Sequence, residues 1–131
     1  MNPIPESFDV KSLIDCKVEM VCFNANQIYI HVTPHYSLLP LNPSFSIVIQ
    51  SAYSIERNNK KINYNINSQI PIKKDDSNFL SLVEEKIEDA YTDPFRKDLS
   101  IKFSNGMLLT LLFNPMYESY EIIVNKHRII M

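Results

Sequence analysis

The fold is stated most plainly by one stretch of the chain, Leu99-Ser-Ile-Lys-Phe-Ser-Asn-Gly-Met-Leu-Leu-Thr-Leu-Leu-Phe-Asn-Pro-Met-Tyr-Glu-Ser-Tyr-Glu-Ile122. Apolar residues occupy alternate positions on both sides of its turn, which is the period of a half-buried β-strand. Asn105-Gly106 is typical of a type I′ turn, because both central residues of that turn have a positive φ. Gly106 is also the only glycine of the chain. The stretch therefore predicts a β-hairpin over residues 99–113, followed by a third strand.

The same alternation predicts further strands along the chain. They cover residues 13–23, 27–33, 45–55, 62–66, 120–124 and 128–131. The strand over 45–55 is long, and we expect it to bend near Ser51-Ala52. The segment 34–44 contains three prolines, which cannot donate to a ladder, so a surface loop is predicted there. Residues 1–11 form a lead-in segment, from which Phe8 and Val10 are expected to pack on the body.

One helix is predicted, over residues 77–92. Its apolar residues Leu80, Val83, Ile87 and Tyr91 recur at helical spacing. The expected fold class is therefore α+β, a mainly antiparallel sheet of about eight strands with one amphipathic helix packed on it. A chain of 131 residues, 45% of them hydrophobic, suits a single domain over residues 1–131.

A faint repeat is visible within the chain. The apolar patterns at residues 28–32, 45–49 and 53–55 recur in the same order at residues 99–103, 109–113 and 120–122. This repetition indicates two hairpin-based halves.

Composition limits the classes of function. The formal net charge of -2 gives no general attraction to nucleic acid or to anionic lipid. The start of the chain lacks a signal peptide pattern, and no segment has the apolar length of a membrane helix. We therefore expect a cytoplasmic protein with neither a nucleic-acid nor a membrane partner. One glycine cannot build a Gly-rich phosphate loop.

The chemically reactive side chains form no convincing constellation, so we expect no catalytic residues, no metal and no cofactor. Cys16 and Cys22 are predicted on one face of a strand, roughly 20 Å apart and too far for a disulfide, as two buried thiols. His31 and His35 are separated by Pro34, which prevents the helical spacing that would direct both to one metal. The alternative to a binding protein is a small ligand- or metal-binding β domain, or an enzyme, that uses the sheet face near His31.

Carboxylates gather on the outer face of the predicted helix. They are Glu84, Glu85, Glu88 and Asp89, followed by Asp93. Such a face is normally solvated, but it also suits a basic partner, whose complementary charge would speed association.

The hairpin and the segment Asn114-Pro-Met-Tyr-Glu-Ser-Tyr-Glu-Ile122 resemble a family of small bacterial immunity proteins. Members are found beside polymorphic and contact-dependent growth-inhibition toxins. Leu13-Ile-Asp-Cys-Lys-Val18 also resembles the opening of that family, with Asp15 at a place where glycine is usual, and Tyr120 stands where tryptophan is commoner.

The resemblance implies a binder without catalysis, which neutralises a cognate toxin domain by blocking its active site. The acidic face suits a basic toxin, such as a nuclease. The residues that carry the resemblance are expected at turn and packing positions; they are Asn105, Gly106, Tyr117, Glu118 and Tyr120. Both a monomer and a homodimer are compatible with the sequence.

Overall fold

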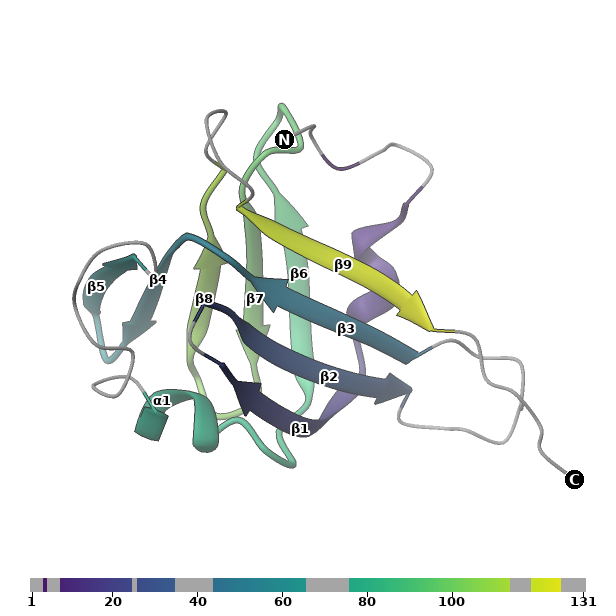
Figure 1. Ribbon diagram of the computed structural model, residues 1–131, viewed down its shortest axis with the longest axis horizontal. Helices are drawn as coiled ribbons and strands as arrows, with labels where there is room; N and C mark the ends of the chain where they lie inside the picture. Colours follow the sequence, from purple (N-terminus) through teal and green to yellow (C-terminus); the bar gives the residue numbers. More distant parts are fainter. Residues whose placement is uncertain are drawn as a thin grey trace, which may run out of the picture.

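The computed structural model describes residues 4, 8–24, 26–34, 44–65, 76–113 and 119–125. These residues form nine strands and very little helix (Figure 1). In chain order the elements are η1 (Val10–Leu13), β1 (Cys16–Phe23), β2 (Ile28–Pro34), β3 (Ser44–Ile49), β4 (Ala52–Arg57), β5 (Lys60–Asn65), α1 (Asp76–Leu80), β6 (Ile87–Thr92), β7 (Leu99–Phe103), β8 (Leu108–Leu111) and β9 (Tyr120–Asn125). The prediction of a mainly antiparallel β protein is confirmed, but the described part is nearly all-β rather than α+β. None of its helices has the length and apolar character needed to cross a membrane.

The strands form two antiparallel sheets, which we call sheet A and sheet B. Sheet A has the order β1-β2-β3-β9, and sheet B has the order β5-β4-β8-β7-β6. In Figure 1 the strands of sheet A run across β6, β7 and β8, which lie behind them. The sheets therefore pack face to face with their strands crossed.

Each half of the chain gives three consecutive strands to one sheet and its fourth strand to the other. β1, β2 and β3 lie in sheet A and β4 joins sheet B, whereas β6, β7 and β8 lie in sheet B and β9 joins sheet A. In sheet B β4 pairs with β8, and in sheet A β9 pairs with β3. The arrangement has a twofold pseudosymmetry, in agreement with the two halves predicted from the sequence.

The first strands of the two halves carry a β-bulge at equivalent positions. One extra residue interrupts the register in each strand, Glu19 in β1 and Glu88 in β6. The flanking pairs correspond one to one: Val18 with Val32 and Met20 with His31 in sheet A, Ile87 with Phe103 and Asp89 with Lys102 in sheet B. A bulge bends its strand and reverses which side chains face inward, so both halves bend in the same way.

The two halves meet at a corner where β1 runs beside the start of β6. Lys17 and Lys86 form an isolated bridge there. Two equivalent hydrogen bonds flank the bridge: the Asp15 amide donates to the Ile87 carbonyl at 2.8 Å, and the Glu84 amide donates to the Val18 carbonyl at 2.9 Å. Asp15 and Glu84 also share a left-handed backbone, with φ values of 71° and 77°.

These contacts align Val10-Lys-Ser-Leu-Ile-Asp-Cys-Lys-Val18 with Phe79-Leu-Ser-Leu-Val-Glu-Glu-Lys-Ile87. Ser, Leu and Lys recur at the same places in both segments. Leu13 and Leu82, which are equivalent, are both completely buried. The segment predicted as a helix therefore repeats the structure of the segment predicted as the first strand.

The helix predicted over residues 77–92 is wrong. Only α1 is α-helical there, and a left-handed residue such as Glu84 cannot continue a right-handed helix. Of the four apolar residues that suggested a helical period, only Ile87 is buried, whereas Leu80, Val83 and Tyr91 are 57%, 37% and 41% exposed. Because of the bulge at Glu88, the buried positions of β6 are Ile87 and Ala90, three residues apart rather than two.

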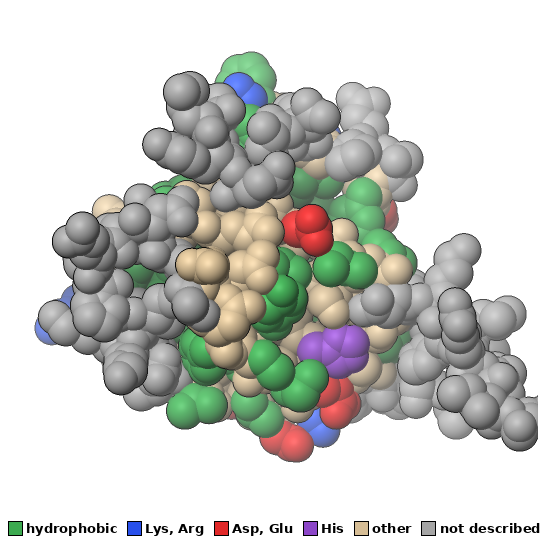
Figure 2. Space-filling view, viewed as in Figure 1, with side chains coloured by type: hydrophobic (Ala, Val, Ile, Leu, Met, Phe, Trp, Pro, Cys, Tyr) green, Lys and Arg blue, Asp and Glu red, His purple; other side chains and the backbone are tan. Residues whose placement is uncertain are grey.

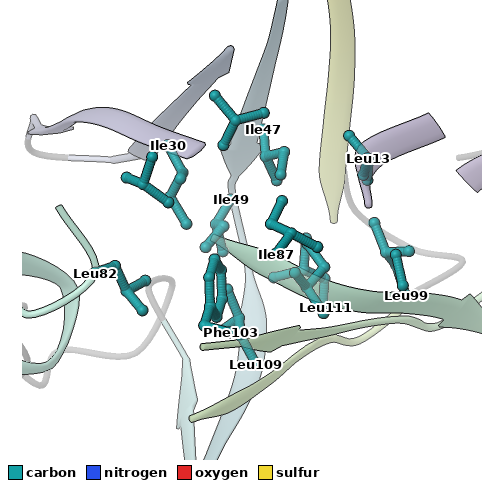
Figure 3. Close-up of a cluster of buried hydrophobic side chains, with 14 of the residues drawn as sticks. Leu13, Ile30, Ile47, Ile49, Leu82, Ile87, Leu99, Phe103, Leu109 and Leu111 are labelled. Carbon is teal, nitrogen blue, oxygen red and sulfur yellow. The ribbon is translucent and has the colours of Figure 1, made fainter. Parts of the chain in front are cut away.

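The core lies between the two sheets. Figure 3 shows side chains from both sheets that point toward one another, together with side chains from η1 and from the turn before β6. The labelled residues have no exposed surface: Leu13, Ile30, Ile47, Ile49, Leu82, Ile87, Leu99, Phe103, Leu109 and Leu111. Ile47 pairs with Ile30, and Leu109 pairs with Ile101. Ile47 of β3 is therefore equivalent to Leu109 of β8, two residues before the position that the sequence pattern matched to it.

The long strand predicted over residues 45–55 is two strands. β3 ends and β4 begins on either side of Gln50-Ser51, where the chain passes from sheet A to sheet B, so the predicted bend is confirmed. The loop predicted over 34–44 lies outside the described residues except for its ends, Pro34 in β2 and Ser44 in β3. The strand predicted over 128–131 lies outside them as well.

The packing predicted for the lead-in segment is confirmed where it is described. The Phe8 ring packs edge-on against the Phe45 ring, with centroids 6.0 Å apart, and Val10 is buried. Arg96 holds this segment in place, since its Nε donates to the Ile4 carbonyl at 3.0 Å and its guanidinium also donates to the Phe8 carbonyl at 2.6 Å.

Candidate functional site

The five carboxylates predicted for a helix face instead lie along and beside β6. We call them the acidic edge. Glu84 and Glu85 belong to the turn before β6, Glu88 and Asp89 lie on β6, and Asp93 follows it. They follow one another along this edge strand of sheet B and do not share the face of a helix.

Two residues of the acidic edge form ion pairs with lysines from other elements. Glu84 Oε2 lies 3.1 Å from Lys17 Nζ, and Asp89 Oδ1 lies 3.0 Å from Lys11 Nζ. The hydrogen bond from Lys11, together with one from the Ala90 amide, lowers the pKa of Asp89. Both pairs are exposed and therefore contribute little stability.

The other carboxylates differ in what they contact. Glu85 accepts a hydrogen bond from the Ser104 hydroxyl. Asp93 organises the loop after β6, because its Oδ1 accepts from the Lys97 amide at 2.7 Å. Glu88, the bulge residue, is exposed and has no hydrogen bond or ion pair within the described part of the chain. It is thus the carboxylate of the set that is most available to a partner.

The hairpin turn predicted at Asn105-Gly106 is present, but its type is different. The Gly106 amide donates to the Phe103 carbonyl at 3.0 Å, and only Gly106, at φ 90°, has a positive φ. This is a type I turn closed by a left-handed residue, so the predicted type I′ turn is wrong. Asn105 helps in another way, since its side-chain oxygen accepts from the Met107 amide at 3.0 Å. A type I′ backbone occurs instead at Asn58-Asn59, with φ values of 52° and 66°.

Tyr120 has the packing role predicted for it. Its ring is buried and its hydroxyl donates to the Lys97 carbonyl. Burial, with the nearby carboxylates of Asp98 and Asp93, raises the pKa of this hydroxyl far above its ordinary value. Tyr117 and Glu118 lie outside the described residues.

The two cysteines do not share a face, because the bulge at Glu19 reverses the alternation along β1. Cys16 is buried, whereas Cys22 is exposed, so the prediction of two buried thiols is wrong for Cys22. Both thiols are free. Burial, with a smaller contribution from Asp15, raises the pKa of the Cys16 thiol to about 11, which keeps it protonated and unreactive at neutral pH.

His31 lies on the outer face of sheet A, on the side opposite to Cys16. Its Nδ1 is 3.1 Å from the Ser46 hydroxyl, and the two residues are cross-strand neighbours. A site that combines His31 with Cys16 is therefore excluded by the geometry. Among the described residues, no group of three or more His, Cys, Asp or Glu side chains could hold a metal ion.

The outer face of sheet A, which we call face A, is the sheet face near His31 that the sequence suggested only as the site of an alternative function. It carries Met20, Cys22, Tyr29, His31, Ser46 and Ile123 in cross-strand register, with Lys17 and Glu121 on its two edge strands. Val48 lies in the same register but is buried. Figure 2 shows this side of the molecule, with hydrophobic side chains in green around a purple histidine, and both acidic (red) and basic (blue) side chains at the border below it. The face could not be found from alternation alone, because the bulge in β1 sends Met20 and Cys22 outward.

The outer face of sheet B, face B, occupies the pseudosymmetric position. It carries Glu56, Asp89, Tyr91, Ser100, Lys102, Leu108 and Thr110. Its central row alternates in charge, with Asp89 opposite Lys102 and Glu56 in the same row. Such a row is typical of a solvated sheet surface.

No protein-family model, curated protein or solved structure matches this chain.

Proposed function

We propose that this protein is a cytoplasmic immunity protein, which binds a cognate bacterial toxin domain of the basic nuclease type and blocks its active site. The observation that supports this most is the backbone at Asp15. The immunity proteins that the chain resembles usually have glycine at this position. Asp15 has a φ of 71°, in the region that glycine favours. The glycine of the resembling turn, Gly106, is left-handed too. At both positions the backbone therefore has a conformation that glycine favours, which supports the resemblance.

The acidic edge gives the proposed binder a way to attract a basic toxin. Its five carboxylates lie along the edge strand β6 and in the segments before and after it, and among the described residues Glu84 and Asp89 are paired with lysines. Complementary charge at the border of an interface mainly raises the association rate and has less effect on dissociation. We expect the acidic edge to act in this way.

The test is binding to the toxin domain encoded immediately upstream of this chain. We expect a complex to co-purify at micromolar concentration. Glu88→Lys should slow association several-fold and leave dissociation unchanged, because Glu88 makes no contact that the folded chain needs. Reversal of Glu84 or Glu85 would be less clean, since these residues contact Lys17 and Ser104.

The matched control is Glu56→Lys, which makes the same change of charge on β4, away from the acidic edge. Association rates measured at low and high salt distinguish the two variants. Absence of a complex with the wild-type chain would refute the proposed function. Equal association rates for Glu88→Lys, Glu56→Lys and the wild type would show that the acidic edge does not attract the toxin.

A further inference from the structure

Faces A and B have the same backbone and different side chains. The register makes Met20 equivalent to Asp89 and His31 equivalent to Lys102. Each pair directly follows the bulge of its own sheet. The Asp89–Lys102 pair of face B is thus replaced on face A by Met20 and His31. A surface that only needs to stay solvated gains nothing from this replacement.

Face A also exposes large apolar side chains. Met20 is 52% exposed, and Ile123, at the other end of the same cross-strand row, is 38% exposed. The equivalent of Ile123 on face B is Glu56. The row Met20–His31–Ser46–Ile123 thus exposes apolar side chains and contains no carboxylate or ammonium group, which is typical of the centre of a protein interface.

The border of face A carries more acidic than basic side chains, and its lysine, Lys17, is paired with Glu84. Glu19 and Glu121 are exposed on strands β1 and β9, on opposite edges of sheet A. Glu84 of the acidic edge lies at the β1 side, 3.1 Å from Lys17, and its side chain is 76% exposed. The acidic edge and face A are therefore continuous across the corner between β1 and β6.

We propose that face A is the docking surface for the cognate toxin domain, and that the toxin presents an apolar patch with a basic border to it. This inference rests on the proposed function. The two surfaces then have different tasks. The acidic edge attracts the toxin, and Met20, Tyr29 and His31 hold it by excluding water, as central interface residues do.

The internal repeat supplies the variant that tests this. Met20→Asp combined with His31→Lys gives face A the charged pair that face B already carries at the equivalent positions. Because Asp89 and Lys102 are accommodated there beside the same bulge, the double variant should fold. We expect its affinity for the upstream toxin domain to fall at least tenfold, mainly through faster dissociation.

The matched control is Lys102→His, the reverse exchange on face B. Thermal unfolding of both variants confirms that they remain folded. We expect Lys102→His to leave the dissociation rate of the toxin domain unchanged, because Lys102 lies outside face A.

A second measurement uses the native thiol on face A. Cys22 is exposed and Cys16 is buried, so a maleimide should label only Cys22 in the folded protein. The bound toxin domain should slow labelling of Cys22 at least tenfold. In a Cys22→Ser background, a Lys102→Cys thiol on face B should be labelled equally fast with and without toxin.

The outcomes separate the two proposals. A wild-type chain that binds no toxin refutes the proposed function itself. A toxin that binds wild type and double variant equally, or that leaves Cys22 unprotected, overturns the role of face A while the proposed function stands.

Discussion

The two halves of the chain share one arrangement of strands and similar interior residues, but their outer side chains differ. Inside, four equivalent pairs keep their apolar character: Val18 and Ile87, Ile30 and Ile101, Ile47 and Leu109, Ile49 and Leu111. Outside, Met20 and His31 replace Asp89 and Lys102. Packing limits what an interior position can accept, whereas an outer position can take on a new role without disturbing the backbone.

The connections between equivalent strands differ as well. β7 and β8 are joined by a short turn around Gly106, whereas the link between β2 and β3 spans residues 35–43. The pairing is nevertheless the same, with Ile30 opposite Ile47 and Ile101 opposite Leu109. Because the entropy of closing a loop rises only slowly with its length, the buried residues rather than the turns determine the register.

The largest expected effect tests whether the halves form one cooperative unit. Ile47→Ala and Leu109→Ala remove equivalent, completely buried side chains. Each should lower the free energy of unfolding by about 2–5 kcal/mol, in a single transition, because the side chains of both halves meet in one core (Figure 3). Urea unfolding followed by fluorescence and by circular dichroism measures this. Two separate transitions in either variant would show that the halves unfold independently.

A smaller effect distinguishes the halves by pH. Cys16 occupies the place that Glu85 has in the second half, and burial raises the pKa of its thiol from 9.0 to about 11. Between these values the unfolded chain loses the proton and the folded chain keeps it, so the free energy of unfolding falls as the pH rises from 9 to 11. The loss attributable to Cys16 should reach ~2 kcal/mol and should be absent below pH 9.

The measurement compares the wild type with Cys16→Ala by urea unfolding at pH 8 and at pH 10.5. Other groups also titrate in this range, Tyr120 among them, but they do so in both proteins. The difference in stability between the two proteins should therefore shrink as the pH rises. A constant difference would mean that the Cys16 thiol ionises equally in both states.

The hairpin over residues 99–113 could be predicted from the sequence because its strands are regular. Apolar residues alternate without interruption there, and the single glycine marks the turn. In β6 the bulge at Glu88 inserts one residue, so the buried residues Ile87 and Ala90 are three residues apart rather than two. A bulge depends on how two strands meet in space, so periodicity along one strand cannot reveal it.

The candidate site was predictable only in part, for the same reason. The carboxylates of the acidic edge are visible as a cluster in the sequence, but their lysine partners come from η1 and β1, distant along the chain. Most of face A could not be predicted from the sequence, because the bulge at Glu19 turns the side chains of Met20 and Cys22 to the outer side of sheet A. Ser, Leu and Lys recur around Leu13 and Leu82. Once this repeat is recognised, the structure of the first strand in one half predicts the structure of the first strand in the other.

The smallest expected effect concerns the left-handed residues at the corner, where the two halves are most alike. Asp15 and Glu84 have φ values of 71° and 77°. Aspartate tolerates this conformation better than glutamate does, because its short side chain bonds locally to the backbone. Glycine at position 84 should therefore remove more strain than glycine at position 15. We expect Glu84→Gly to raise the free energy of unfolding by up to ~1 kcal/mol, after allowing for the greater freedom of glycine in the unfolded chain.

Asp15→Gly should change stability by less than about half that amount. Glu84→Gln is the control, because it removes the charge that pairs with Lys17 and keeps the strained backbone; it should leave the urea midpoint unchanged. If Glu84→Gln instead stabilised the chain as much as Glu84→Gly, the carboxylate and not the backbone would be the source of the strain. If Asp15→Gly gave the larger gain in the free energy of unfolding, the backbone strain at Asp15 would exceed the strain at Glu84, although the two residues make matched hydrogen bonds.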